Sequence, residues 1–341
     1  MFEPTILSID TSCDETSAAV TSGRRVLSNV ISSQVNLHKK YGGVYPALAK
    51  RAHLERIDAV VNEAFKRAGR LLPLSAVAVT QGPGLAIALE VGIKKAKEIS
   101  LEHNLPLISV NHMEGHIYST LSQNKNGNPK REVVFPTLCL LVSGGHTQLV
   151  FMKAHGEFEL IGETLDDACG EALDKAAKIL KLGYPGGPII ERLSQRGKPV
   201  FPFGRPLKER TDLNFSYSGL KTQFLYLVES LNEKDFGKNI ANLAASFQEA
   251  AFEQLTRKTS FAIKIYQPKT LLCGGGVIAN QYLRSLLRKL GKKEKVPVFF
   301  PPTNKLIGDN AAMIGVAAYF KFQRKEFSNP ESLDRLPRLS F

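Results

Sequence analysis

The sequence predicts a duplicated α/β fold, in which each half of the chain forms a sheet covered by helices. Three observations carry this prediction. Short β-branched runs alternate with longer amphipathic stretches, which is the pattern of a mixed α/β protein. The first three strands of each half are separated by tight turns, as in β-hairpins. The same order of elements then occurs twice in 341 residues, as a repeat of element order and not of residue identity.

The first half is predicted to cover residues 1–133. Three hairpin-linked strands come first, followed by helix, strand, helix, strand and a last helix that carries two histidines. The predicted strands are 5–10, 16–21, 26–31, 76–80 and 106–110, and the helices are 47–68, 85–103 and the stretch that begins at His112. The helix 47–68 shows apolar side chains at the spacing of one helical face, including Ile57, Val60 and Val61.

The second half, residues 134–341, repeats this plan. Its predicted strands are 135–142, 147–152, 157–162, 270–273 and 296–300, with helices near 279–290 and 308–320 and an inserted basic and aromatic segment near 183–240. In open parallel sheets, ligands collect beyond the carboxyl ends of the strands. We therefore expect two lobes around a central cleft, with ligands held at the strand ends.

Composition excludes several classes of protein. With 43% hydrophobic and 23% charged residues, the chain is neither disordered nor fibrous. No apolar run is long enough to cross a bilayer, and we expect no membrane association. The four scattered cysteines predict free thiols and a cytoplasmic location. The net charge of +13 favours a polyanionic partner such as RNA or DNA, although many basic proteins bind no nucleic acid.

A metal site is the first functional prediction. His112 and His116 lie four residues apart, so that a helix places both on one face, where two imidazoles can share a metal ion. The matching helix of the second half starts near Asp309, and two facing halves would bring these helix starts together. A set of two histidines and one carboxylate suits Fe(II) or Zn(II). The alternatives are two packed or solvated histidines and an Asp309 that merely caps its helix.

Glycine turns follow three predicted strands, at 81–84, 143–145 and 274–276. Backbone N–H groups in such turns hold phosphate or carboxylate oxygens. Because turns occur in both halves, we expect an adenine nucleotide or an acyl phosphate to bind. The sequence has neither a Walker A motif nor a strand-linked GxGxxG, which leaves the actin-like ATPase arrangement, although the turn 10–15 lacks the glycine usual in such kinases.

Two other chemistries have little support. A zincin requires Glu directly after its first His, whereas Glu114 follows His112 by two residues. A covalent nucleophile of the Ser-His-Asp or Cys-His type is not recognisable in the sequence. We therefore expect neither a metalloprotease nor an enzyme with a covalent intermediate.

Taken together, the motifs resemble those of the tRNA N6-adenosine threonylcarbamoyltransferase family, the TsaD family, in its bacterial branch. They run in family order over nearly the whole chain, and the only noted departure is the stretch 86–90 with Glu90. The motifs are 8–16 (SIDTSCDET), 81–85 (QGPGL), 111–116 (NHMEGH), 141–148 (LVSGGHTQ), 166–175 (DDACGEALDK), 184–187 (YPGG), 215–222 (FSYSGLKT), 274–277 (GGGV) with Asn280, and 308–310 (GDN).

This resemblance implies a duplicated actin-like ATPase fold and an acyltransferase. The implied enzyme transfers the threonylcarbamoyl group from L-threonylcarbamoyladenylate to N6 of adenosine 37 in tRNAs that read codons beginning with A, forming t6A and releasing AMP. His112, His116 and Asp309 match metal ligands, usually for iron. The positions that match substrate-binding residues are Leu141, Val142, Ser143, Gly144, Gly145, Asp174, Gly187 and Asn280.

The resemblance also implies partners, namely tRNA, a TsaB-like paralogue and a TsaE-like ATPase. We expect the helix 47–68 to meet the paralogue. Within 196–221, cations alternate with aromatic residues and could contact the tRNA, whereas a packed insertion with solvated charges is the alternative. The residues concerned are Arg205, Lys208, Arg210 and Lys221 with Phe201, Phe203, Phe215 and Tyr217. The basic run 284–295 reads as a solvated helix face.

Two competing functions remain open from the sequence. A small-molecule kinase of the actin-like class would transfer the ATP γ-phosphate without tRNA. A non-catalytic partner like TsaB would lack the metal triad. His146 is expected to be a turn residue, with a catalytic base as the alternative.

Overall fold

The computed structural model describes residues 3–69, 73–204, 207 and 210–341. The chain divides into two compact units, one formed by residues 1–132 with 300–341 and one formed by residues 133–299. Each unit contains one five-stranded sheet. The four cysteines are free thiols, as predicted.

In the first unit the strand order is β3-β2-β1-β4-β5. β1, β2 and β3 pair antiparallel, as hairpins do, while β4 and β5 continue the sheet parallel to β1. The strands are β1 (Thr5–Asp10), β2 (Glu15–Ser22), β3 (Arg25–Ser33), β4 (Ala76–Gly82) and β5 (Leu107–Asn111). All five lie within two residues of the predicted strands.

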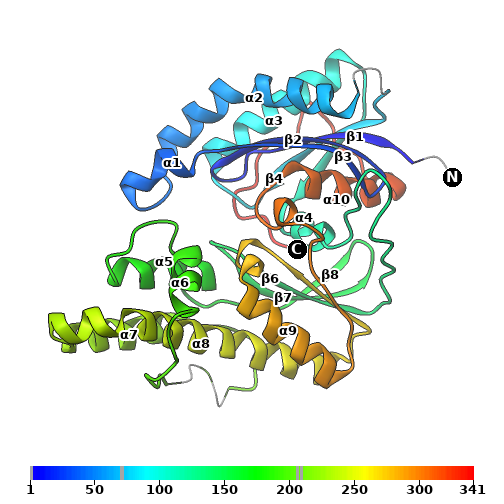
Figure 1. Cartoon of the computed structure of the whole chain (residues 1–341). Helices are drawn as coiled ribbons and strands as arrows, with labels where there is room; N and C mark the ends of the chain where they lie inside the picture. Colours follow the sequence, from blue (N-terminus) through cyan, green and yellow to red (C-terminus); the bar gives the residue numbers. More distant parts are fainter. Residues whose placement is uncertain (1–2, 70–72, 205–206, 208–209) are drawn as a thin grey trace. The chain divides into compact units, whose positions relative to one another are not determined.

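Helices cover both faces of this sheet (Figure 1). α2 (Pro46–Ala68) and α3 (Ala86–Glu102) pack on one face, and α4 (His112–Ser119) and α10 (Ala311–Gln323) pack on the other. A short α1 (Val35–His38) and the 3-10 turn Lys39–Tyr41 precede α2. The core between the sheet and α2 and α3 is built from buried aliphatic side chains, among them Leu7, Ile9, Val60 and Leu89.

The position of residues 300–341 differs from the predicted boundary, which assigned them to the second half. They belong to the first unit because α10 packs directly on β1 and β2 and against α4. Ser8 Oγ in β1 donates a hydrogen bond to the Ala311 carbonyl at 2.6 Å. At Gly315 a Cβ would lie 2.7 Å from Thr21 Oγ1, so the small residue permits this close approach.

The second unit repeats the strand order of the first, because β10-β9-β6-β7-β8 corresponds to β5-β4-β1-β2-β3. The antiparallel hairpins and the parallel pairs also correspond, which confirms the predicted duplication. The strands are β6 (Thr137–Val142), β7 (Thr147–Ala154), β8 (Glu157–Glu163), β9 (Thr270–Gly274) and β10 (Val298–Phe299). Only β10 is clearly shorter than predicted.

The helices of the second unit include a 34-residue helix, α8 (Glu233–Tyr266), to which the smaller helices attach (Figure 1). These are α5 (Cys169–Ile179), α6 (Gly186–Ser194), α7 (Ser218–Ser230) and α9 (Gln281–Glu294), with a 3-10 turn at Gly276–Ala279. Fully buried aromatic rings such as Phe224 and Phe247 hold α7 on α8, with their centroids 4.8 Å apart. Within the described residues no helix is long and apolar enough to cross a membrane.

Candidate functional site

The two histidines of the first unit are placed by a helix cap. Asn111 ends β5, and its side-chain oxygen accepts a hydrogen bond from the Met113 N–H at 2.8 Å, so that α4 begins at His112. His112 and His116 are thus one turn apart on the same face, as predicted. Their rings are 4.7 Å apart between centroids and nearly perpendicular, at 80°.

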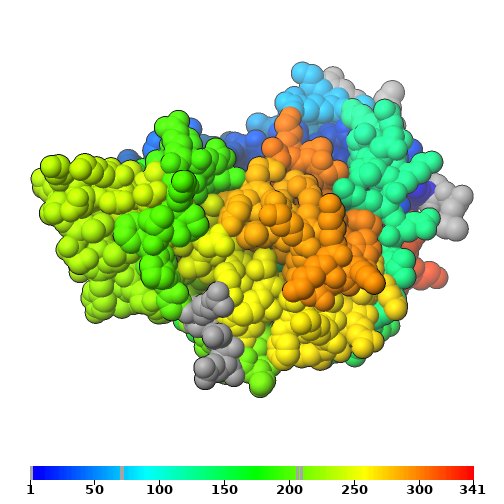
Figure 2. Space-filling view, turned by 60° about the horizontal axis from the view of Figure 1, so that its bottom comes forward, coloured from blue at the N-terminus to red at the C-terminus, as the bar shows by residue number. Residues whose placement is uncertain are grey.

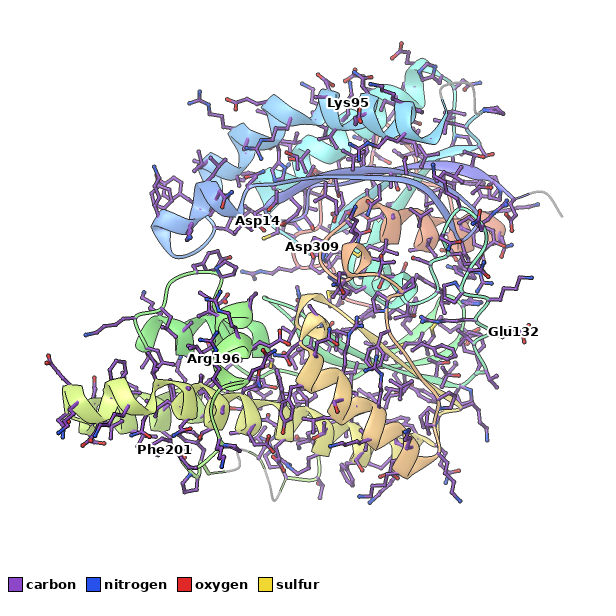
Figure 3. All side chains as sticks on the ribbon, in the orientation of Figure 1. Asp14, Lys95, Glu132, Arg196, Phe201 and Asp309 are labelled. Carbon is purple, nitrogen blue, oxygen red and sulfur yellow. The ribbon has the colours of Figure 1, made fainter. Side chains whose placement is uncertain are left out.

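Asp309 meets both histidines. Its Oδ1 lies 3.4 Å from Nε2 of His112 and 3.3 Å from Nε2 of His116. The helix cap is supplied by Asn310 instead, whose side chain accepts from the Met313 N–H at 3.1 Å. The alternative of Asp309 as the cap of α10 is therefore wrong. Figure 3 shows Asp309 on the loop that leads into α10.

These three residues are a group able to hold a metal ion, since one potential ligand atom from each lies within 4.8 Å of the others. His116 is completely buried, and neither of its ring nitrogens has a hydrogen-bond partner among the residues that the structure describes. The same holds for Asp10 Oδ2 and His112 Nδ1, which are also buried and lie 3.8 Å apart. Buried polar atoms without partners are costly, and a divalent ion bound between His116 and Asp309 would satisfy Nε2 of His116. The donor set fits such an ion.

The charges of the group are strongly coupled. Burial acts to lower the pKa of His112, but the carboxylates of Asp309 and Asp10 outweigh it and raise the pKa to about 10. Burial lowers the pKa of His116 below its usual value. Burial opposes ionisation of Asp309, yet the two histidines hold its pKa well below the usual range. Asp309 is therefore a carboxylate, which is the form that binds a cation.

The predicted triad is brought together, but not by two facing halves of the chain. The sequence predicts Asp309 in the second half and the histidines in the first. In the structure all three belong to the first unit, because α10 returns to the first sheet and packs against α4. The three residues that could hold a metal ion thus all lie within one unit.

Two further carboxylates, Asp14 and Glu15, lie where the turn after β1 leads into β2. They belong to the motif 8–16, to which the sequence assigned no role. Burial, then the charges of Asp14 and Asp309, raise the pKa of Glu15 to about 10. Asp14 is labelled with Asp309 in Figure 3, on the same unit. The adjacent acidic residues Asp14 and Glu15, at the junction of a turn and a buried strand, were the signal that could have identified this turn.

The second unit contains a cavity of about 210 Å³ at the ends of its central strands. Four of the predicted substrate-binding residues line it, namely Gly144, Asp174, Gly187 and Asn280. Gly276 and Val277 from the third glycine turn are in its wall as well. Glu191 lines the cavity too and was missed, because a glutamate on an amphipathic helix has no distinguishing pattern.

Asp174 and Asn280 shape this cavity through helix starts. Asp174 Oδ1 accepts hydrogen bonds from the N–H groups of Gly186 and Gly187, at 2.6 and 3.2 Å, where α6 begins. Burial raises the pKa of Asp174, and these two hydrogen bonds oppose the rise. Asn280 caps α9 by accepting from the Leu283 N–H at 3.1 Å. Two turns of the cavity wall therefore depend on these side chains.

The turn after β6 offers fewer amides than predicted. The Ser143 N–H is already used, because it donates to the His146 carbonyl at 2.8 Å, and Ser143 Oγ accepts from the His146 N–H at 3.1 Å. Gly144 and Gly145 are exposed, and a Cβ on either would meet open space. Available backbone amides are therefore those of the two glycines. The side chains of Leu141 and Val142 are fully buried, so these residues can offer only their backbone.

Glycine is needed for packing at the other two turns. Gly275 has φ +94°, and a Cβ there would lie 2.4 Å from the Val142 carbonyl oxygen. At Gly82 a Cβ would lie 1.8 Å from the Leu336 carbonyl oxygen, and the Gly84 N–H donates to the Pro337 carbonyl at 3.2 Å. The turn 81–84 therefore holds the C-terminal segment, and the expectation that it binds phosphate is not supported.

The predicted RNA-contacting segment is largely a packed insertion. Phe215 and Tyr217 are completely buried and cannot stack on bases. Lys221 pairs with Asp167 at 2.7 Å, and Arg210 pairs with Asp212. Phe201 is half-buried, and Phe203 packs near Phe224, with centroids 6.0 Å apart. Arg205 and Lys208 lie outside the described residues.

Glu90 on α3, where the sequence departs from the family pattern, pairs with Lys50 at 3.1 Å.

The repeated sheets define the class of protein, a duplicated actin-like ATPase fold. Among solved structures, the chain is similar to HypF from T. kodakarensis, with a TM-score of 0.64, 14% identity, and coverage of 95% of this chain and 48% of that one. It is also similar to the activator of 2-hydroxyisocaproyl-CoA dehydratase from Clostridium difficile with bound ADPNP, with a TM-score of 0.52, 14% identity, and coverage of 95% and 98%. At this identity the likeness concerns the fold.

Sequence comparison identifies the family. Residues 25–316 match the family model described as TsaD, tRNA N6-adenosine threonylcarbamoyltransferase. A protein of that name from Carboxydothermus hydrogenoformans is 47% identical over 98% of this chain and 97% of its own length. One from Bacillus subtilis is 45% identical over 94% and 91%. The chain belongs to the tRNA N6-adenosine threonylcarbamoyltransferase family.

Proposed function

We propose that this chain forms t6A in tRNA with a metal ion held by His112, His116 and Asp309 and an adenylate donor held in the 210 Å³ cavity. As its family implies, the reaction transfers a threonylcarbamoyl group to N6 of adenosine 37. The adenine amine attacks the carbamoyl carbon of L-threonylcarbamoyladenylate. A C–N bond forms, the C–O bond to phosphate breaks, AMP leaves with the electron pair, and the amine loses a proton.

The chemistry needs no covalent intermediate, since the donor is an activated mixed anhydride. An exocyclic adenine amine is a weak nucleophile, so orientation and stabilisation of charge are the main contributions left to the protein. The exposed Gly144 and Gly145 amides suit the adenylate phosphate, and the α6 start fixed by Asp174 shapes the adjoining wall. His146 remains a turn residue whose carbonyl closes the loop.

A divalent ion would be held by the Nε2 atoms of the two histidines and a carboxylate oxygen of Asp309, with iron expected and zinc as the alternative. When bound, it would supply a positive charge for anionic substrate oxygens. The observation that carries this proposal is the buried His116, whose Nε2 has no hydrogen-bond partner among the described residues but lies 3.3 Å from Asp309 Oδ1.

The test compares His116→Ala with His103→Ala, a histidine exposed at the end of α3. Each variant is incubated with tRNA, threonine, bicarbonate, ATP and the partner proteins, and t6A is measured by mass spectrometry alongside metal content. We expect His116→Ala to lose both metal and t6A, with His103→Ala unchanged. Undiminished t6A at limiting metal in the His116 variant would overturn the proposal.

The partners are a TsaB-like paralogue and a TsaE-like ATPase, and the site of action is the cytoplasm, where tRNA is modified. α2 and the turn before it present exposed apolar side chains for the paralogue. Tyr41 and Tyr45 stack at 5.2 Å and are each half exposed, and Leu54 is 54% exposed. Exposed apolar groups of this kind mark protein interfaces. Leu54→Asp should prevent co-purification with the paralogue, and an unchanged complex would remove this surface from the proposal.

A further inference from the structure

The second unit contains another cavity, of about 590 Å³, apart from the one assigned to the donor. Its walls come from the second half of α8, the end of α9 and residues 210–211. Figure 2 shows this face, with α8 in yellow and α9 in orange side by side. A space of this size accommodates a nucleotide.

Among the described residues, the cavity is lined by five cationic side chains, Arg210, Arg257, Lys258, Lys264 and Lys293, and by one carboxylate, Glu253. Most nearby carboxylates are already engaged. Glu253 pairs with Arg257 at 3.2 Å, and Asp212 pairs with both Arg210 and Lys258. The Glu294 carboxylate accepts from Ser260 Oγ at 2.8 Å. The wall is therefore ordered by its own ion pairs.

Two lysines on the rim differ from the other cations. Lys264 and Lys293 are exposed, and within the described part of the chain neither forms an ion pair. They come from α8 and α9, which lie next to each other. The lining of the same cavity includes two apolar residues, Phe261, which is 36% exposed, and Leu290. Positive charge beside an exposed aromatic ring is the combination that holds a phosphate and an unstacked base.

We propose that this cavity binds a nucleotide unit of the tRNA, with phosphate on Lys264 and Lys293 and the base or ribose over Phe261. The inference rests on the proposed function, which supplies the RNA. It joins two basic stretches, around Arg210 and at 284–295, that are separate in sequence and adjacent in the fold. The contact positions tRNA and is not part of the chemical step.

The principal test is the double charge reversal Lys264→Glu with Lys293→Glu. The matched control is Lys234→Glu with Lys238→Glu, two exposed lysines at the opposite end of α8, about 40 Å from Lys264 by helix rise. Both doubles change the net charge equally. Affinity for unmodified tRNA is measured against salt concentration, and t6A formation is measured against tRNA concentration.

We expect the Lys264 and Lys293 double to weaken tRNA binding at least about 10-fold and to reduce the slope of log affinity against log salt by about 1 per lysine. KM for tRNA should rise while turnover at saturating tRNA is kept. Phe261→Ala should weaken binding without changing the salt slope, because it removes no charge. The control double should keep the wild-type affinity and slope.

Equal behaviour of the two doubles would overturn the inference, as would inorganic phosphate or AMP binding at the cavity with tRNA affinity unchanged. If the charge reversal unfolds the protein, Lys264→Gln with Lys293→Gln replaces it, because glutamine adds no repulsion. We then expect a smaller loss of tRNA affinity and the same change in the slope of log affinity against log salt. Wild-type protein that forms no t6A would contradict the proposed function instead. The two failures are thus distinguishable.

Discussion

The two units share one sheet topology but carry different chemistry at corresponding turns. In the first unit the turn between β1 and β2 contains Asp14 and is flanked by Asp10 and Glu15, the strand residues on either side of it, close to the His-His-Asp group. In the second unit the corresponding turn, between β6 and β7, is Ser143 to His146 and contains two exposed glycines. The duplicated sheet therefore places a turn at the same position in both units, and the two turns differ in what they offer: carboxylates in the first unit and exposed backbone amides in the second.

The helices that follow the last strand of each sheet, α4 after β5 and α10 after β10, differ as well. After β5 the chain enters α4 at once, whereas after β10 it passes through Asp309 and returns as α10 to the first sheet. The first unit thus receives both helix starts, and with them all three residues of the group that could hold a metal ion. If the two units bind different ligands, as proposed, a substitution in one unit should leave binding in the other unchanged. The following substitutions compare binding and stability in the two units.

The largest effect is expected from Asp309→Asn, which removes the negative charge that faces both histidines. Metal content should fall to background and t6A formation by about 100-fold or more, because a neutral amide is a poor ligand for such an ion. Binding of AMP to the second unit should persist, as measured by calorimetry. Asp334→Asn, at an exposed position, is the control. Full metal occupancy in Asp309→Asn would show that the triad is not the ligand set.

Gly275→Ala should destabilise the second unit by about 3 kcal/mol, since its φ of +94° is unfavourable for alanine and the Cβ would meet the Val142 carbonyl. Denaturant unfolding measures this loss. The matched change is Gly145→Ala, where the Cβ meets open space. That variant should keep its stability and bind the adenylate less well. Equal stability of the two variants would contradict the packing role of Gly275.

Asn111→Ala removes the cap of α4 and should cost about 1 kcal/mol of stability. It should also weaken metal binding, because both histidines stand on that helix. Asn232→Ala removes the corresponding cap of α8, where Asn232 accepts from the Asp235 N–H at 2.9 Å. A similar loss of stability with unchanged metal affinity is expected there. The idea fails if both variants bind metal as the wild type does.

The smallest effect concerns pH. Burial raises the pKa of Asp174 above its unfolded value, so the folded state holds this proton more tightly. Folding stability from this residue is greatest below the unfolded pKa and declines as pH rises through the folded pKa. Asp174→Asn keeps an oxygen for the Gly186 and Gly187 amides and should flatten that decline. Thermal unfolding of the wild type and of Asp174→Asn between pH 3 and pH 7 measures how stability changes with pH in each. Parallel curves of stability against pH would contradict the prediction.

Much of the fold was predictable because its signals are local. Strand alternation, helical spacing and turn residues gave the order of elements and the repeat, and the four-residue spacing placed His112 and His116 on one face. The family motifs pointed to residues that line one cavity of the second unit, among them Asp174, Gly187 and Asn280. These features depend on neighbours a few residues apart, which a sequence displays directly.

The rest was decided by packing between distant segments. Asp309 reaches the histidines because α10 packs on the first sheet, a contact that no local pattern encodes. Phe215 and Tyr217 resemble RNA-binding aromatics in sequence but are buried, and the Ser143 amide is consumed within its own turn. Burial and hydrogen-bond partners depend on how segments that are distant in sequence pack together. The sequence therefore determined the helices, the strands and the candidate ligands, and the tertiary structure determined which of these residues meet.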